Sequence, residues 1–327
     1  MIKLENIKRV LVISLSNIGD ITLTTPVVEA LCGTFPGAGI DILISPHGKE
    51  IFEKHPKVSE LILYIKKQNL ADKLKLIKKL SSKKYDLVVD LKNTAIPYLI
   101  GAKYRLPLFR KKIKDAHKKN QHFSLLKYFG IEQKPYGMKI YFDDEDVGKA
   151  SRAISSIKGD FCVFSCGAKS HVKRWAPENF ALLADFIKSK LGIEVVLIGK
   201  DEGIHPDSDR VVSDKVKNAS KVDLFDLVGK TNIRELTYII SRAKFIVTND
   251  SAPLHIASAV NTPTIAVFGP TDEKKYGPLS EQHIILKKDM DCRPCEMAQC
   301  KFNYECMRQI TIQDAIRAVN SILSRKF

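Results

Sequence analysis

The chain has 327 residues, too many for one typical small domain, and 44% of them are hydrophobic, which is enough for two substantial cores. No stretch approaches the roughly 20 apolar residues that cross a bilayer, and the N-terminus lacks a signal-peptide pattern. We therefore expect a cytoplasmic protein whose seven cysteines do not form a disulfide framework. The formal net charge of +16 indicates an anionic partner, namely nucleic acid, an anionic membrane surface or a phosphorylated substrate, unless the lysines only solvate the surface.

Apolar runs of strand length alternate with helical patterns in the first half of the chain. The run Arg9–Leu15 is typical of a strand buried on both faces of a parallel sheet, and it ends in the turn Ser16–Asp20 before a helical stretch from Ile21 to Leu31. Further strands are expected at residues 40–45 and 85–91. Between them Leu70, Leu74, Ile77 and Leu80 would form one helix face. The basic run at residues 110–119 is the best candidate for a functional cationic patch.

The second half repeats this α/β style. Strands are expected at residues 161–165, 194–198 and 264–268, and helices at 177–191, 233–243 and 312–324. A fresh series of strands begins after Lys158–Gly159, so we expect two doubly wound, Rossmann-like domains, 1–158 and 159–327. If they face a central cleft, the strand ends and the ligand lie between them.

The segment Thr248–Thr271 predicts a strand that turns through small polar residues into a helix. The helix N-terminus would aim its N–H groups at one spot suited to a phosphate, although an ordinary turn capped by Asp250 or Ser251 fits the same residues. In the loop before residue 177, Lys173 and Arg174 could neutralise a pyrophosphate or could simply be solvated.

Two other side chains have both a functional and a structural interpretation. Asp20 follows the first strand, where a carboxylate could accept a proton from a substrate hydroxyl, or could cap the next helix, for which Thr25–Pro26 is an alternative start. His255 could contact a phosphate or sugar, or be a satisfied structural residue.

Four cysteines, Cys292, Cys295, Cys300 and Cys306, form a C-x2-C-x4-C-x5-C pattern. This spacing is compatible with a structural zinc site, and free thiols are the alternative. Neither G-x-G-x-x-G nor a P-loop motif occurs, which weakens both common nucleotide-binding interpretations.

Several stretches together resemble glycosyltransferase family 9, the bacterial heptosyltransferase-like enzymes. They are SLSNIGDITLTTPVVEAL, FSCGAKSHVKRWAPENFALLADFI, VVLIGKDEG, DLVGKTNIRELTYII and TNDSAPLHIASAVNTPTIAVFGPTDEKKYGP. The resemblance implies a GT-B fold and an inverting, metal-independent sugar transfer that needs no cofactor. It implies ADP-L-glycero-D-manno-heptose as donor and the phosphorylated inner core of lipopolysaccharide as acceptor. The enzyme would act on the inner face of the plasma membrane, as a peripheral protein on the anionic leaflet.

The resemblance also suggests roles for individual residues. It implies that Asp20 is the catalytic base, that Lys173 contacts the donor phosphates and that Glu202 contacts the donor ribose. Ala252 stands where the family usually has glycine, so a methyl group could narrow the donor site. The remaining donor-binding candidates are Ala168, Lys169, Arg174, Thr231, Asp250, Ser251, Pro253, Leu254 and His255, and the weaker acceptor-binding candidates are Asn17, Gly19, Lys111 and Lys112.

Three other functions stay open at this point. The chain could use a different nucleotide sugar or glycan acceptor, or it could be a sugar-nucleotide epimerase, which would convert its substrate without an acceptor. It could also be a non-catalytic basic protein that binds membrane surfaces or nucleic acid. Specific nucleic-acid binding ranks low because basic and aromatic residues do not alternate as a stacking platform requires.

Overall fold

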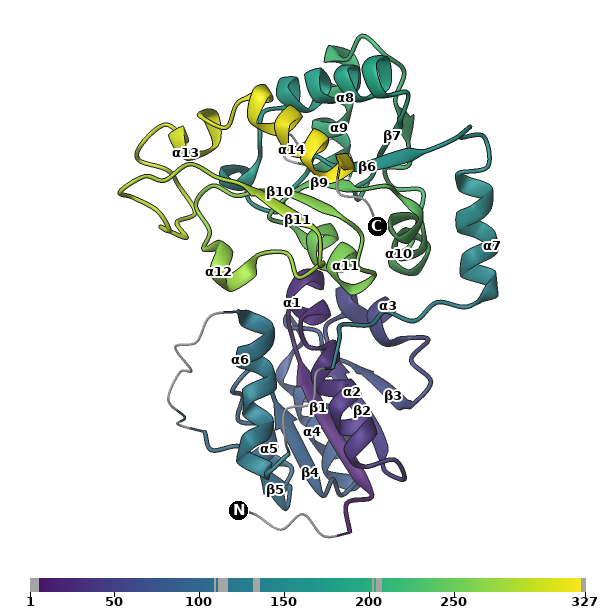
Figure 1. The fold of residues 1–327 in the computed structure, drawn as a ribbon. Coiled ribbons are helices and arrows are strands. Elements are labelled where there is room, and N and C mark those ends of the chain that lie inside the picture. The colour runs from purple at the N-terminus through teal and green to yellow at the C-terminus, as the bar shows by residue number, and fades with distance from the viewer. Residues whose placement is uncertain are drawn as a thin grey trace. The chain divides into compact units, whose positions relative to one another are not determined.

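The computed structural model describes residues 6–108, 110, 117–131, 136–201, 203 and 208–324. It divides the chain into two compact units, Met1–Tyr141 and Phe142–Phe327. Each unit is an α/β structure built on its own parallel sheet (Figure 1). None of the helices in the described ranges is long and apolar enough to cross a membrane.

The unit boundary lies earlier than the expected one at residues 158–159. The reason is helix α7 (Asp144–Ala153), which packs against helix α10 (Ile233–Arg242). Arg234 Nε donates to Asp146 Oδ2 at 2.8 Å, and the rings of Phe142 and Tyr238 meet edge to face at 5.8 Å. These contacts make α7 part of the second unit.

The sheet of unit 1 has the strand order β3-β2-β1-β4-β5, and all neighbouring strands are parallel. The central strand β1 buries its apolar side chains on both faces, as its sequence predicts. The strands are β1 (Arg9–Ser14), β2 (Gly39–Ile44), β3 (Val58–Leu63), β4 (Leu87–Asp90) and β5 (Tyr104–Arg105). The helices are α1 (Ile18–Thr22), α2 (Thr25–Thr34), α3 (Lys49–Phe52), α4 (Leu70–Ser82), α5 (Ile96–Leu99) and α6 (Lys118–Ser124), with 3-10 turns η1 (Pro46–Gly48) and η2 (Leu125–Phe129).

One local prediction in unit 1 needs correction, and another is refined by the burial of its side chains. The helical stretch expected from Ile21 to Leu31 is two helices, α1 and α2, because Pro26 in the first turn of α2 suits the start of a new helix. In α4 the predicted apolar face is only half buried. Leu80 lies in the core, whereas Leu70 and Leu74 are 73% and 60% exposed.

The sheet of unit 2 has the order β11-β10-β9-β6-β7-β8 and is again parallel throughout. Its core centres on Trp175, which is fully buried, stacks edge to face on Phe180 and donates Nε1–H to Ile310 O at 2.9 Å. The strands are β6 (Phe161–Ser165), β7 (Glu194–Leu197), β8 (Phe225–Asp226), β9 (Ile246–Asn249), β10 (Thr264–Val267) and β11 (His283–Leu286). The remaining helices are η3 (His171–Lys173), α8 (Pro177–Leu191), α9 (Asp209–Ala219), α11 (Ala252–Ala259), α12 (Glu273–Tyr276), α13 (Glu305–Arg308) and α14 (Ile312–Ser324).

Each sheet changes winding direction once. In unit 1 the chain adds β2 and β3 on one side of β1 and then β4 and β5 on the other. In unit 2 it adds β7 and β8 on one side of β6 and then β9, β10 and β11 on the other. Open α/β sheets bind ligands beyond the carboxyl ends of the strands at such a switch point. Ligand sites are therefore expected at the loops after β1 and β4, and at those after β6 and β9.

Candidate active site

Asp20 lies at the switch point of unit 1, in the short helix α1 that directly follows β1. Ser16 Oγ donates to Asp20 Oδ2 at 3.0 Å, and Ser45 Oγ donates to the carbonyl oxygen of Ser16 at 2.6 Å. Thr24, not Asp20, occupies the N-cap position of α2, so the alternative of a helix cap is wrong. Asp20 is thus a partly exposed carboxylate oriented by a neighbouring hydroxyl, and it can accept a proton from a bound hydroxyl.

Positive charge gathers beside Asp20, on the loop that follows β4. The Asp90 carboxylate accepts from Lys92 N at 2.8 Å and from Thr94 Oγ1 at 2.8 Å, which shapes this loop. Arg110 Nη2 donates to the carbonyl oxygen of Asp90 at 2.7 Å, which places a guanidinium at the same end of the sheet. An anionic group could therefore be held near Asp20. The expected acceptor contacts Lys111 and Lys112 lie outside the described residues. Asn17 is the N-cap residue of α1, and Gly19 directly precedes Asp20 within that helix.

His122, on α6, is a buried residue of this region that the sequence did not single out. It is 3% exposed, and its Nε2 has no hydrogen-bond partner among the described residues. Burial lowers the pKa of His122 to about 3, with Lys118 and Lys92 acting in the same direction and Asp20 in the opposite one. The imidazole is thus neutral at working pH and lies within electrostatic range of the candidate base.

The His122 pKa predicts a pH dependence of stability. The unfolded imidazole takes up a proton below about pH 6.5, whereas the folded one does so only near pH 3. Unfolding therefore consumes a proton between these values, and the free energy of unfolding falls as the pH drops, by up to about 1.4 kcal/mol per pH unit. Urea titrations between pH 7 and pH 4.5 should show a shallower fall for His122→Gln than for the wild type. The exposed His47→Gln is the matched control, and equal slopes for all three chains would refute the prediction.

In unit 2, Lys173 and Asp250 meet at the switch point between β6 and β9. Lys173 ends η3 in the loop after β6, and Asp250 follows β9 directly. Lys173 Nζ lies 2.6 Å from Asp250 Oδ2, and the side chains are 28% and 6% exposed. The ammonium group is thus fixed by a buried carboxylate while remaining accessible to a ligand. This contact joins two of the predicted donor-binding residues.

Asn249 ties the two loops together beneath this ion pair. Its buried side chain accepts from Trp175 N at 3.0 Å and donates from Nδ2 to the carbonyl oxygen of Cys166 at 2.7 Å. Arg174 bends back within its own loop, donating Nε–H to the carbonyl oxygen of Ala168 at 2.9 Å. The positions of Lys173 and Asp250 therefore depend on bonds between segments far apart in sequence.

Helix α11 begins at the same place. Ser251 occupies its N-cap position and makes no side-chain capping bond, although its carbonyl oxygen accepts from Leu254 N at 3.2 Å. Pro253 in the first turn has no N–H to lose. Ala252 is helical and is not among the residues with positive φ, so alanine at the family's glycine position causes no backbone strain. Leu254 and His255 are buried in the first turn. The N-terminus of α11 can bind an anion that also contacts Lys173.

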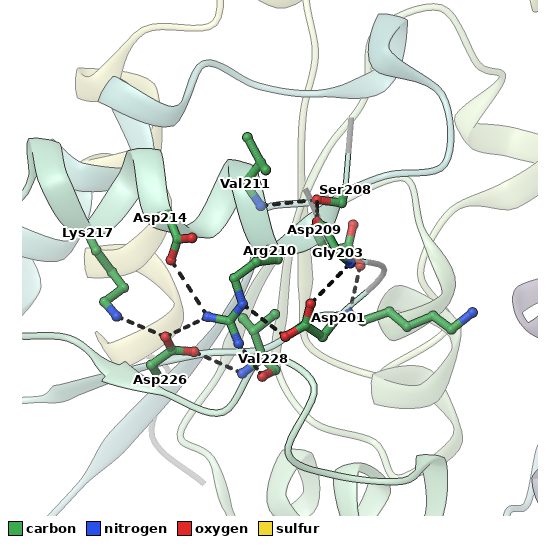
Figure 2. Close-up of polar contacts among 11 residues, drawn as sticks. Asp201, Gly203, Ser208, Asp209, Arg210, Val211, Asp214, Lys217, Asp226 and Val228 are labelled. Atoms are coloured by element: carbon green, nitrogen blue, oxygen red, sulfur yellow. Dashed lines mark hydrogen bonds and ion pairs between the residues drawn. The ribbon is translucent and has the colours of Figure 1, made fainter. Parts of the chain in front are cut away.

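A third loop region, shown in Figure 2, is built around Arg210 in the first turn of α9. Its guanidinium donates to Asp226 Oδ2 at 2.8 Å, to the carbonyl oxygen of Val228 at 2.6 Å and to Asp201 Oδ2 at 3.3 Å. Arg210 thus joins the loop after β7 to the loop after β8. Thr231 lies on the loop after β8, and β8 is two strands away from β6 in the sheet. Glu202 is outside the described residues.

Asp209 connects this region to the loop after β6. Its Oδ2 accepts from Lys200 N at 3.0 Å. A Cβ atom at Gly167 would lie 1.8 Å from Asp209 Oδ1, so only glycine allows the two loops to approach this closely. The start of α9 therefore holds the loops after β6, β7 and β8 in one arrangement.

Arg210 and Lys217 offer a matched test of this arrangement. Both donate to Asp226 Oδ2, at 2.8 Å and 2.9 Å, but only Arg210 also binds Val228 and Asp201. Arg210→Gln should lower the free energy of unfolding by about 1–3 kcal/mol, and Lys217→Gln, an exposed ion pair, by less than about 1 kcal/mol. Urea denaturation of both variants tests this, and losses of equal size would show that Arg210 contributes no more than a surface charge.

The zinc site with which the cysteine spacing is compatible finds no support in the described residues. Across the described residues, no group of three or more His, Cys, Asp or Glu side chains is arranged to hold a metal ion. Cys306 is buried in the hydrophobic core at the start of α13, where burial raises the pKa of its thiol, whereas Cys292, Cys295 and Cys300 are partly exposed. All four cysteines are free thiols in the structure, which is the alternative that the sequence left open.

Together these features define an α/β protein with a carboxylate at the switch point of one sheet and, at that of the other, a lysine–aspartate pair beside a helix N-terminus. The comparisons with known proteins agree. Residues 73–305 match the model of glycosyltransferase family 9 (heptosyltransferase), which covers more than half of the chain. The chain belongs to this family and is a glycosyltransferase.

Curated and solved relatives extend this similarity along the chain. Lipopolysaccharide heptosyltransferase 3 of Escherichia coli K12 is 29% identical over 334 residues, covering 93% of this chain and 95% of that protein. A family 9 glycosyltransferase structure from Veillonella parvula DSM 2008 matches with a TM-score of 0.82 at 23% identity, covering 97% of both chains. The E. coli ADP-heptose LPS heptosyltransferase II matches with a TM-score of 0.78 at 22% identity, covering 96% of this chain and 98% of that one. At these identities the two structures establish the fold.

Proposed function

We propose that this glycosyltransferase transfers a heptose from ADP-heptose to a phosphorylated inner-core acceptor of lipopolysaccharide. The observation that carries the proposal is the Lys173–Asp250 pair beside the N-terminus of α11, in a chain of glycosyltransferase family 9. This arrangement suits the diphosphate of a nucleotide sugar. The names of the two E. coli relatives supply the sugar and the acceptor class.

In this proposal the two units are the halves of a GT-B enzyme, with the acceptor on unit 1 and the donor on unit 2. Asp20 removes the proton from the acceptor hydroxyl, whose oxygen attacks the anomeric carbon from the face opposite the nucleotide. The bond from that carbon to the diphosphate oxygen breaks, and the configuration inverts. Lys173 and the first amides of α11 stabilise the negative charge on the leaving diphosphate, which is the role a metal ion serves elsewhere.

The other residues have supporting roles. Glu202 and Thr231 hold the nucleoside. Glu202 follows β7 and Thr231 follows β8 in the chain, and Arg210 joins the loops after these two strands. On unit 1, Lys92 and Arg110 attract the anionic groups of the acceptor towards Asp20. Such an enzyme works as a peripheral protein on the inner face of the plasma membrane, where its glycolipid acceptor lies.

A donor screen followed by a transfer assay tests the function. ADP-heptose should raise the melting temperature more than UDP- or GDP-sugars, and heptose should then appear on a phosphorylated inner-core acceptor with inverted configuration by NMR. A chelator should leave the rate unchanged. Conversion of the nucleotide sugar without any acceptor would identify an epimerase instead, and a stronger shift with a UDP-sugar would reject the proposed donor.

A further inference from the structure

Exposed apolar side chains cluster on one segment of unit 1. Leu63, Ile65, Leu70 and Leu74 are 40%, 49%, 73% and 60% exposed, and all lie between the end of β3 and the middle of α4. Leu70 and Leu74 are four residues apart and therefore share one helix face, whereas Leu80 of the same helix is buried in the core. Monomeric soluble proteins rarely leave large apolar patches in water unless they bind something there.

Lysines surround these apolar side chains. Residues 65–79 contain six lysines and a single acidic residue, Asp72. Lys75 lies 3.7 Å from Asp72, and Lys79 lies 2.7 Å from Glu60. The other four, Lys66, Lys67, Lys73 and Lys78, form no ion pair in the part of the chain that the structure describes. The segment therefore carries uncompensated positive charge next to exposed leucines.

The next helix carries a further exposed apolar side chain. Helix α5 contacts α4, and its Leu99 is 62% exposed. We name the whole surface the Leu–Lys face and define it by Leu63, Ile65, Lys66, Lys67, Leu70, Lys73, Leu74, Lys78 and Leu99.

We propose that the Leu–Lys face docks unit 1 onto an anionic lipid bilayer. Leucine and isoleucine side chains enter the boundary of the acyl chains, while the flanking lysines bind phosphate head groups with their long stems along the apolar surface. A second copy of the chain is a poor occupant because two such lysine-rich faces repel each other. Nucleic acid is also a poor occupant, because exposed leucines offer bases no stacking surface.

This docking proposal rests on the proposed function, because a glycolipid acceptor lies in a membrane. The experiment below can refute the docking proposal without refuting the proposed function. The probes are vesicles of phosphatidylcholine alone and of phosphatidylcholine mixed with phosphatidylglycerol, with the full chain followed by flotation. The wild type should bind only the anionic vesicles and should dissociate as salt is raised. Leu70→Asn/Leu74→Asn should weaken binding about tenfold, and Lys66→Gln/Lys67→Gln/Lys73→Gln roughly 100-fold at low salt.

Two sets of control variants change exposed residues elsewhere. They are Leu182→Asn/Leu323→Asn and Lys190→Gln/Lys215→Gln/Lys221→Gln, all on unit 2, and both should bind like the wild type. All variants should transfer sugar to a water-soluble acceptor at the wild-type rate, which verifies folding.

Several outcomes would overturn the docking proposal. They are equal binding to neutral vesicles, unchanged binding of the leucine variant, and binding of the face to DNA or to a second copy in place of vesicles. Transfer to a soluble acceptor without vesicle binding would overturn this inference alone. Vesicle binding without any transfer would instead overturn the proposed function.

Discussion

Asp20→Asn should lower the rate of sugar transfer about 10²- to 10⁴-fold while leaving the affinity for ADP within about twofold of the wild type. Asparagine keeps the size of the side chain and an oxygen that can still accept from Ser16 Oγ, which donates to the carboxylate at 3.0 Å. It removes only the ability to take up a proton. The loss should therefore appear in kcat, measured with a soluble acceptor, and not in calorimetric binding of the nucleotide.

A matched control separates chemistry from local electrostatics. Asp72 is also an acidic residue in the first turn of a unit 1 helix, so Asp72→Asn makes the same change of charge at a helix N-terminus away from the switch point. This variant should transfer sugar to the soluble acceptor at the wild-type rate. If Asp20→Asn turned over like Asp72→Asn, another group would have to be the base.

The strands were the most predictable feature of the fold. The apolar runs at residues 9–15 and 161–165 correspond to β1 and β6 because strands buried on both faces need continuous apolar sequence. The segment around Asp250 was also predictable, since a strand, a small-residue turn and a helix are encoded within a few residues. Strand order could not be read in this way, because β1 pairs with β4 across a long stretch of chain.

The rest of the candidate site depends on contacts that local patterns do not encode. Asn249 bonds to Cys166, and Arg210 bonds to Val228. His122 is buried near Asp20. Each of these pairs comes from elements that are far apart in the sequence. The boundary between the compact units differs from the expected domain boundary for the same reason, since α7 is assigned by its contacts with α10. The burial of the apolar face of α4 could not be predicted either, because periodicity predicts a helix but does not say how much of the apolar stripe the core covers.

Lys173→Ala should weaken ADP binding roughly 10- to 100-fold, because the diphosphate loses a charge-assisted hydrogen bond in a partly buried site. Calorimetry measures this directly. Lys188 is the matched control: it is also an ion-paired lysine of unit 2, 2.8 Å from Glu194 and 29% exposed, but it lies on α8, away from the β6–β9 switch point. Lys188→Ala should bind ADP like the wild type.

The Lys173 variant also leaves the buried Asp250 carboxylate without its cation, so it should lower the melting temperature as well. The double variant Lys173→Ala/Asp250→Asn separates the two effects, because a neutral amide does not need the cation. Its stability should recover while its affinity for ADP stays low, since neither substitution restores a positive charge for the diphosphate. If the affinity recovered together with the stability, Lys173 would serve only to neutralise Asp250, and the amides of α11 alone would have to hold the donor.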